Sequence, residues 1–369
     1  MKCVDLGSEY CPCPLALTGD CLICSRLQER SGFDGSSERM FPSGEDCDCE
    51  WSGSCPYTVL VQNGGKVAEG RQEFPVRLVE RKDYGEDGSV LVLDVGRGLA
   101  QKASQPGSFV FLRRVQGEDQ NRGAAETGSF VYGDTPISVM RADEAEGTIH
   151  LAIRREGPKS KMLLDRALAI DDVREEKACG SLKYKETYQI RGPYYSGLLG
   201  KEALRPANVK GKKILFLTKG IGAAPVLLTM NRLMTMDGTE GGKVQGAEKK
   251  PLTQIRWLAD DTKIDRKLIE DYVRMIGGDI RPEYTVLAGS PGAGRMVELL
   301  GEEYYDIVVI SGSPYFVETM RREMKTLLPE AELVVSNNAT MCCGEGICGA
   351  CTEVAEDGRV IRRCKCDER

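Results

Sequence analysis

The sequence predicts a multidomain protein in which an antiparallel β-barrel domain is followed by an α/β domain with a parallel sheet, with a small cysteine-rich segment at each end. Three observations support this prediction. Short strand-like runs separated by turn residues fill the first half of the chain, as in antiparallel barrels. Beyond about residue 210, strand and helix patterns alternate, as in parallel sheets covered by helices. Nearly all of the 15 cysteines lie close to the two ends.

Composition and charge limit the class of protein. The chain has 369 residues, of which 41% are hydrophobic and 29% charged, as in ordinary soluble globular proteins. Its formal net charge is −6 and neither half is strongly basic, which argues against a nucleic-acid partner and against binding to an anionic membrane surface. The longest apolar runs, such as residues 214–217 and 307–310, are too short to cross a bilayer. No apolar signal segment follows the first methionine, so we expect a cytoplasmic location.

Residues 1–57 are predicted to form a cysteine-rich cap. Eight cysteines lie in the first 55 residues and six in the last 28. Disulfides are disfavoured in a reducing compartment, and short C-x-C and C-x2-C spacings are typical of chelating thiolates. The candidate ligands in the cap are Cys11, Cys13, Cys21, Cys24, Cys47, Cys49 and Cys55. Three interpretations stay open, namely a further iron–sulfur cluster, a structural zinc ion and unmetallated thiols.

Residues 70–208 are predicted to form the antiparallel barrel. The expected strands cover residues 74–79, 90–95, 109–112, 137–140, 149–153 and 187–190. Turn residues separate them, and a helix is expected around residues 161–169. The single histidine, His150, lies in one of these strand-like runs and is interpreted as structural rather than catalytic.

Residues 209–335 are predicted to form the α/β domain. The expected strands cover residues 212–218, 253–259, 284–287, 305–311 and 333–335, and the expected helices cover residues 223–236, 264–276, 295–300 and 315–328. Strands that alternate with helices in this way indicate a parallel sheet with helices on both faces.

A glycine turn follows the first strand of the predicted α/β domain. Its candidate residues are Gly220, Gly222, Ala223 and Pro225, directly before a helix. Glycines at this position allow a pyrophosphate to approach the helix N-terminus, although a tight strand-to-helix turn without ligand has the same pattern. Asp260 ends the next strand, where its carboxylate could accept hydrogen bonds from a ribose and would repel a 2′-phosphate. This favours NADH over NADPH, unless Asp260 belongs to a solvated acidic loop.

Residues 336–369 contain the second cysteine group. Cys343, Cys348 and Cys351 have the spacing C-x4-C-x2-C, and Cys364 follows after a predicted turn. This is the plant-type spacing of [2Fe-2S] ligands, in which glycines let one loop wrap around the cluster. We therefore predict a [2Fe-2S] cluster here, with structural zinc or inert thiols as the alternatives. The neighbouring Cys342 and Cys366 are interpreted as buried or free thiols.

Four motifs in order resemble those of the ferredoxin-reductase superfamily. The first covers Thr135, Pro136, Ile137 and Ser138, with threonine where the family usually has arginine. The second contains Gly192 and Pro193, followed by Tyr195 where glycine is usual. The glycine turn is the third, and the fourth contains Gly312, with Ser311 in place of a cysteine. Within the superfamily, the chain resembles the electron-transfer subunits of type B dihydroorotate dehydrogenases and the small subunits of NADH-dependent reduced ferredoxin:NADP oxidoreductases.

This resemblance implies a function in electron transfer. It implies FAD held by the barrel through the first two motifs, and NAD(H) bound by the glycine turn, Asp260 and Gly312. Electrons would move between NAD(H), FAD and the [2Fe-2S] cluster to a partner, which would be a catalytic flavoprotein, an iron–sulfur subunit or ferredoxin, in a complex of the transhydrogenase or flavin-bifurcating type. No side chain is expected to act as a catalytic acid or base. The alternatives are the electron-transfer subunit of a dihydroorotate dehydrogenase and a non-catalytic iron–sulfur redox sensor or scaffold.

Overall fold

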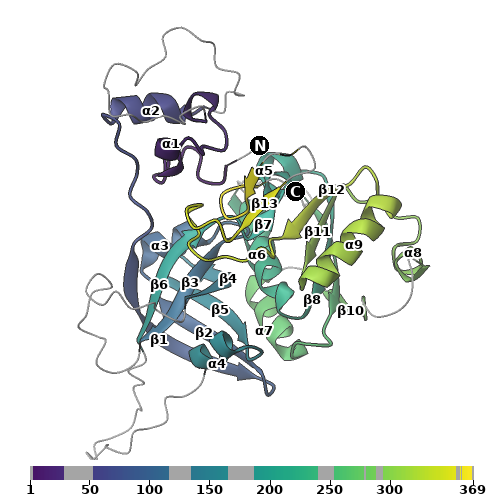
Figure 1. The fold of residues 1–369 in the computed structure, drawn as a ribbon. Coiled ribbons are helices and arrows are strands. Elements are labelled where there is room, and N and C mark those ends of the chain that lie inside the picture. Colours follow the sequence, from purple (N-terminus) through teal and green to yellow (C-terminus); the bar gives the residue numbers. More distant parts are fainter. Residues whose placement is uncertain are drawn as a thin grey trace, which may run out of the picture. The chain divides into compact units, whose positions relative to one another are not determined.

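A computed structural model describes residues 3–28, 53–115, 134–164, 187–239, 253–277, 280–287, 294–354, 358 and 360–367. The chain forms two compact units. The terminal unit consists of Met1–Gln72 and Ala339–Arg369, and the central unit consists of Glu73–Asn338. The predicted barrel and the predicted α/β domain therefore lie together in the central unit, and the two predicted cysteine-rich segments lie together in the terminal unit (Figure 1).

The first half of the central unit is a closed antiparallel barrel. Its strands are β1 (Glu73–Tyr84), β2 (Gly88–Asp94), β3 (Phe109–Val115), β4 (Thr135–Asp143), β5 (Thr148–Arg154) and β6 (Thr187–Tyr194). They pair in the order β1-β2-β5-β4-β3-β6, and β6 closes the barrel by pairing with both β1 and β3. Branched and long aliphatic side chains such as Leu91, Val110, Val139 and Leu151 fill its interior. The predicted barrel is confirmed, and each of its six predicted strands overlaps an observed one.

Two short helices accompany the barrel. The helix α3 (Arg97–Ala103) was not predicted, because its seven residues are too few to show a helical period. Ala100 and Ala103 are its buried residues. The helix α4 (Pro158–Leu164) begins three residues before the predicted helix. The rest of that prediction lies outside the described residues.

The second half of the central unit is a six-stranded sheet. Its strands are β7 (Leu198–Leu199), β8 (Lys213–Lys219), β9 (Gln254–Asp260), β10 (Pro282–Tyr284), β11 (Ile307–Ser311) and β12 (Glu332–Ser336). The order is β10-β9-β8-β11-β12-β7, and every pairing is parallel except that of β7, which is antiparallel to β12. The two-residue edge strand β7 was not predicted, since it is too short to carry a pattern.

One predicted strand is misplaced in sequence. The prediction put it at residues 284–287, whereas β10 ends at Tyr284. The residues that follow bind the end of β9 instead, because the Thr285 amide donates to the Ala259 carbonyl over 3.0 Å and the Leu287 amide donates to the Asp260 carboxylate over 3.0 Å. An apolar run can thus follow a strand without continuing it.

Helices cover both faces of the sheet, as predicted (Figure 1). They are α5 (Pro206–Val209), α6 (Ala223–Thr239), α7 (Arg266–Ile276), α8 (Gly294–Leu300) and α9 (Pro314–Leu327). Alternate residues of β8 face opposite ways: Ile214 and Phe216 pack with α6 and α7, while Leu215 and Leu217 pack with α8 and α9. A strand that is buried on both faces has to be apolar throughout, which explains the continuous run in the sequence.

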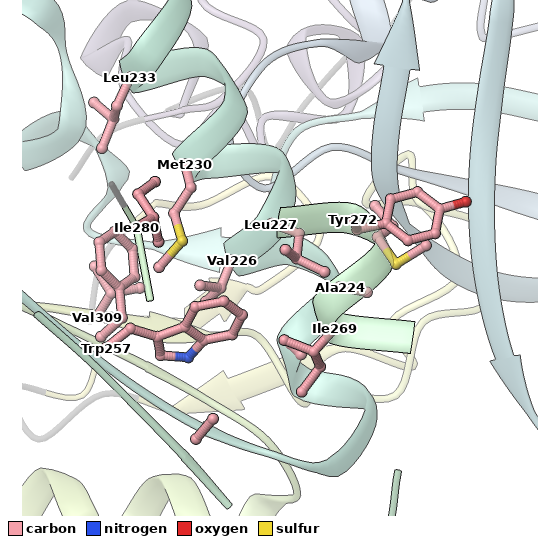
Figure 2. Close-up of a cluster of buried hydrophobic side chains, with 14 of the residues drawn as sticks. Ala224, Val226, Leu227, Met230, Leu233, Trp257, Ile269, Tyr272, Ile280 and Val309 are labelled. Carbon is pink, nitrogen blue, oxygen red and sulfur yellow. The ribbon is translucent and has the colours of Figure 1, made fainter. Parts of the chain in front are cut away.

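The barrel and the sheet share one core. Met230, Trp257, Ile269 and Tyr272 belong to the cluster on the α6–α7 face of the sheet (Figure 2). Barrel residues such as Met140 extend the same cluster. The two predicted cofactor-binding regions are therefore joined by continuous apolar packing within one unit.

The terminal unit is built from short elements. They are α1 (Leu15–Thr18), the 3-10 turn η1 (Ser25–Leu27), α2 (Pro56–Gln62) and the hairpin of β13 (Thr352–Val354) and β14 (Val360–Arg362). Its apolar cluster is small, with Ala16, Cys24, Leu27 and Leu60 as the buried members. No helix in the described part of the chain is long and apolar enough to cross a membrane.

Candidate functional site

The four C-terminal cysteines of the predicted cluster lie together in the terminal unit. The Cys348 amide donates to the Cys343 sulfur over 3.5 Å, and the Cys364 amide donates to the Cys351 sulfur over 3.4 Å. The Cys364 thiol, together with the hydrogen bonds to the Cys343 sulfur, lowers the pKa of Cys343 to about 4, and the pKa of Cys351 is lowered to about 6. The pKa values of Cys348 and Cys364 are raised, that of Cys364 chiefly by its contacts with Cys343 and Cys351. Cysteine binds a metal ion as the thiolate, so a lowered thiol pKa favours binding.

Backbone amides of the same loop point at these sulfurs. The Glu345 amide donates to the Cys343 sulfur over 3.3 Å, and the Gly346 amide donates to the Cys364 sulfur over 3.1 Å. Gly344 and Gly346 have φ values of 72° and 77°, in the left-handed region that glycine adopts without strain. These glycines bend the loop so that its amides reach the cysteine sulfurs.

Four cysteine side chains are a donor set that suits either a [2Fe-2S] cluster or a zinc ion. Among the residues that the structure describes, no three or more cysteine, histidine or acidic side chains already form a site for one metal ion. A mononuclear site needs all of its ligand atoms about 2.3 Å from one point. A cluster with two irons instead needs its thiolates spread around a larger body.

The N-terminal cysteines are only partly described. Cys47 and Cys49 lie outside the described residues, so only part of the predicted ligand set is placed. Burial is the main cause that raises the pKa of Cys11 and of Cys24 to about 11. The sulfur of Cys55 accepts a hydrogen bond from the Thr58 amide over 3.5 Å at the start of α2. The remaining candidates, Cys13 and Cys21, are partly buried.

The glycine turn lies at the expected place in the sheet. Gly220 and Gly222 form a 3-10 turn between β8 and the 17-residue helix α6, whose first residues include Ala223 and Pro225. A Cβ atom on Gly222 would lie 2.4 Å from the carbonyl oxygen of Ser311, so only glycine fits there. The turn therefore lies directly against the loop that follows β11.

That contact marks the crossover point of the sheet. From β8 the chain proceeds first to β9 on one side and later to β11 on the other. Loops at the carboxyl ends of two such strands separate and form the usual ligand-binding crevice of an α/β sheet. Gly312 follows β11 at this edge, and a Cβ there would lie 2.6 Å from a ring carbon of Phe316. The positive end of the α6 dipole lies at the same edge, where an anion is stabilised.

A buried hydroxyl beside Gly312 supports a polar ligand here. Ser311 is fully buried, and its Oγ has no hydrogen-bond partner among the described residues. Buried hydroxyls are normally paired, so a polar atom of a bound nucleotide would satisfy an otherwise costly group. Serine at this position, where the resembling family has cysteine, retains a hydrogen-bonding group.

Asp260 has a different role from the one predicted. Its side chain is fully buried and forms a 2.6 Å ion pair with Lys219. It also accepts hydrogen bonds from the Thr262 hydroxyl over 2.6 Å and from the Leu287 amide over 3.0 Å. Burial opposes ionisation, but these donors outweigh it and lower the pKa of the carboxyl group. Asp260 thus joins β8, β9 and the loop after β10, and it does not present a free carboxylate to a ribose.

The first motif lies on the barrel strand β4. Thr135 and Ile137 are partly exposed and Pro136 is exposed, and all three pair with β3. Ser138, opposite Phe109, is also partly exposed. The motif is therefore accessible along one side of the barrel wall.

The second motif lies at the end of β6. Gly192 has a φ of 147°, and a Cβ there would lie 3.1 Å from a methyl group of Val110, so the position requires glycine. Pro193 follows and is buried. Tyr195, in place of the usual glycine, is also buried, below the ammonium group of Lys201 at 5.4 Å.

Arg191 is a candidate binding residue that the motif comparison did not single out. It precedes Gly192, and its guanidinium lies 4.5 Å from the ring centre of Phe111. It also contacts Asp134, the residue before the first motif, at 3.4 Å. The guanidinium therefore lies next to the position where threonine replaces the family's arginine. The sequence signal was present, since Arg191 begins the second motif.

The comparisons with known proteins gave only remote similarities. No protein-family model matches the sequence, and no curated protein matches it. An NADH-dependent reduced ferredoxin-NADP oxidoreductase, described in work on flavin-based electron bifurcation, is 18% identical with a TM-score of 0.49, covering 78% of this chain and 85% of that one. A flavohemoglobin from Malassezia yamatoensis with bound FAD and heme is 12% identical with a TM-score of 0.42. The similarity covers 72% of this chain and 60% of the flavohemoglobin. The ferredoxin reductase in carbazole 1,9a-dioxygenase is 14% identical with a TM-score of 0.43, over 72% and 69% of the two chains.

Similarities of this size do not indicate function. The chain's own architecture is more informative, because the closed six-stranded barrel, the parallel sheet after it and the glycine turn after β8 occur in the predicted order. The central unit thus combines a closed antiparallel barrel with a parallel sheet, as the sequence predicts.

Proposed function

We propose that this protein is the electron-transfer subunit of an oxidoreductase complex, which moves electrons between NAD(H), FAD and a [2Fe-2S] cluster to a partner subunit. The observation that carries the proposal is the glycine-bent loop in which backbone amides donate to the sulfurs of Cys343, Cys351 and Cys364. The cysteine loop would hold a centre that carries one electron at a time. The barrel and the sheet of the central unit would hold the flavin and the nucleotide, which exchange two electrons. When bound, the flavin supplies this conversion between a hydride carrier and a one-electron centre.

The chain's own residues would bind and orient these groups. Residues 135–138, with Gly192 and Pro193, would line the flavin, and Arg191 would supply the positive charge that Thr135 lacks. The glycine turn and Gly312 would hold the nucleotide phosphates and ribose near the N-terminus of α6. Asp260 would fix the turn through Lys219 rather than contact the ribose. The choice of NADH over NADPH therefore has to be measured.

An electron-transfer subunit needs a partner protein that accepts its electrons. A catalytic flavoprotein, an iron–sulfur subunit or ferredoxin would accept electrons from the cluster, in a complex of the transhydrogenase or flavin-bifurcating type. The N-terminal cysteines would bind a second iron–sulfur cluster or a zinc ion in the same unit. A pull-down that recovers a dihydroorotate-oxidising subunit would favour the alternative assignment as a dihydroorotate dehydrogenase subunit.

The test is quantitation of flavin, iron, zinc and labile sulfide in the purified protein, followed by titration with NADH and NADPH. We expect flavin bands that bleach with the preferred nucleotide, together with the absorbance of a [2Fe-2S] cluster. Cys348→Ser should lose cluster absorbance and onward electron transfer but keep flavin bleaching. Cys342→Ser is the matched control, because this exposed neighbour lies outside the ligand set and should keep both signals.

Other outcomes would contradict the proposal. Zinc without labile sulfide at the four cysteines would remove the one-electron centre. Cluster absorbance without flavin and without a nucleotide response would instead favour the redox sensor or scaffold.

A further inference from the structure

Four charged residues from distant parts of the chain meet in the interior of the terminal unit. The ammonium of Lys365 lies 2.5 Å from the carboxylate of Asp5 and 2.7 Å from that of Glu345. The guanidinium of Arg71 lies 2.7 Å from Asp5 and 3.3 Å from Glu345. Each carboxylate therefore bridges both cations. We call these four residues the buried ion network.

The network is balanced and shielded from water. Its two positive and two negative charges cancel, and the exposed fraction of each side chain is 12% or less. The ring of Tyr10 covers the guanidinium of Arg71 at 3.9 Å. Removing one member of such a network leaves an uncompensated buried charge, which is far more costly than losing an exposed ion pair.

Two members of the network lie next to the predicted cluster ligands in the sequence. Glu345 lies between Cys343 and Cys348, and its own amide donates to the Cys343 sulfur. Lys365 directly follows Cys364. The network therefore fixes the backbone at two points where the chain touches the sulfurs.

The other two members come from outside the cysteine motif. Asp5 belongs to the N-terminal segment, which is joined to the C-terminal end by a hydrogen bond of 2.8 Å from the Val4 amide to the Lys365 carbonyl. Farther along this segment, Leu15 lies so close to Gly346 that a Cβ on that glycine would be 2.8 Å from one of its methyl groups. The first residues of the chain thus form a second layer around the cysteine loop.

We propose that Asp5 and Arg71 are positioning residues for the cluster, so that the N-terminal segment is an integral part of the cluster-binding domain and determines how firmly the cluster is held. This inference rests on the proposed function, since it needs a cluster at the four cysteines. In it, Asp5 and Arg71 orient Glu345 and Lys365, and these two hold the loop amides at the sulfurs. Groups that orient metal ligands in this way commonly contribute to metal retention as much as some ligands do.

The test compares cluster retention in the full-length, cluster-loaded protein. The variants are Asp5→Asn, Lys365→Gln and the pair of both, and loss of cluster absorbance is followed after addition of EDTA. Each single change leaves one buried charge uncompensated, so cluster loss should be roughly 10- to 100-fold faster than in the wild type. The pair restores charge balance and should recover part of the loss. The electron paramagnetic resonance spectrum of the reduced cluster should shift in the single variants, which a remote effect on folding would not cause.

Glu353→Gln is the matched control. Glu353 pairs with Arg363 at 2.6 Å in the same unit, but it lies outside the network and is half-exposed. The variant removes this one acidic partner. Cluster loss in this variant should stay within about twofold of the wild type. Flavin content and its bleaching by NADH report on the central unit. The thermal transition followed by circular dichroism, compared with that of the wild type, shows whether the whole variant has folded.

The outcomes separate the inference from the proposed function. Wild-type retention and an unchanged spectrum in both single variants would overturn the inference while the cluster itself remains. If the single variants do not fold, the pair decides, because rapid cluster loss despite restored charge balance would also overturn it. A wild-type protein without labile sulfide would instead remove the proposed function on which the inference rests.

Discussion

At the residue scale, buried polar side chains in the central unit serve to join elements. Asp260 was predicted to face a ribose, yet its carboxylate is occupied by Lys219, Thr262 and the Leu287 amide. His150, predicted to be structural, lies on β5 and shares a 2.7 Å hydrogen bond with the hydroxyl of Tyr272 on α7. These contacts join the barrel to the sheet and the strands to their loops.

His150 should make stability depend on pH. Burial, with Arg141 and Lys82 nearby and opposed by Asp143, lowers its pKa from 6.5 to about 4. As pH falls, the imidazole is therefore protonated in the unfolded chain before it is protonated in the folded protein. The contribution of His150 to the free energy of unfolding is fully present above about pH 6.5 and is lost toward pH 4, by roughly 3 kcal/mol at most. Urea unfolding of the wild type and of His150→Gln at pH 7 and pH 5 measures this difference.

The controls for His150 separate burial from hydrogen bonding. The Gln variant should lose part of the pH dependence because it has no group that titrates in this range. Tyr272→Phe keeps the buried imidazole and should keep most of the dependence. An equal pH dependence in the wild type and the Gln variant would show that His150 is not its source.

At the element scale, loops at the carboxyl ends of neighbouring strands specify the candidate nucleotide site. The glycine turn after β8 was predicted from its own sequence, and so was the loop after β11. Their mutual contact follows from the parallel pairing of the two strands, in which Thr218 lies opposite Ser311. This pairing explains why glycine is required at position 222.

Gly222→Ala should therefore be destabilising. The added Cβ would lie 2.4 Å from the backbone carbonyl of Ser311, which cannot move away as a flexible side chain could. We expect a loss of about 1–3 kcal/mol in the free energy of unfolding, measured in urea, with weaker flavin bleaching by NADH. Gly98→Ala in α3 is the control, because no atom lies within 4 Å of its Cβ position. It should be neutral or stabilising by up to about 1 kcal/mol. Equal stability of the two variants would refute the steric argument.

At the scale of the whole molecule, the two units differ in what holds them together. All three large apolar clusters lie within the central unit. The cluster in the terminal unit has four buried residues. Among the residues that the structure describes, this cluster is small, and small cores are commonly stabilised by a metal or other cross-links. The same unit holds most of the cysteines and the buried ion network.

The central unit should consequently fold by itself. A fragment of residues 73–338 is expected to give a cooperative thermal transition by circular dichroism and to retain flavin that NADH bleaches. It should contain no iron, since all four predicted cluster ligands lie in the terminal unit. An unfolded fragment, or one that binds iron, would contradict this division of roles.

The sequence by itself determined the features that depend on local spacing. The six barrel strands, the alternation of strands and helices, the glycine turn and the C-x4-C-x2-C loop all follow from periods or intervals within a few residues. The positions of β7 and α3 were missed because elements this short have no measurable period.

Only the tertiary structure decided which distant residues meet. Asp5 and Lys365 are 360 positions apart, and the sequence around neither residue predicts that the two form an ion pair. Likewise, two distant segments bring Lys219 and the Leu287 amide to the carboxylate of Asp260. The physical reason is that periodicity reports the local backbone and its apolar face, whereas the partner of a buried charge is set by packing of the whole chain.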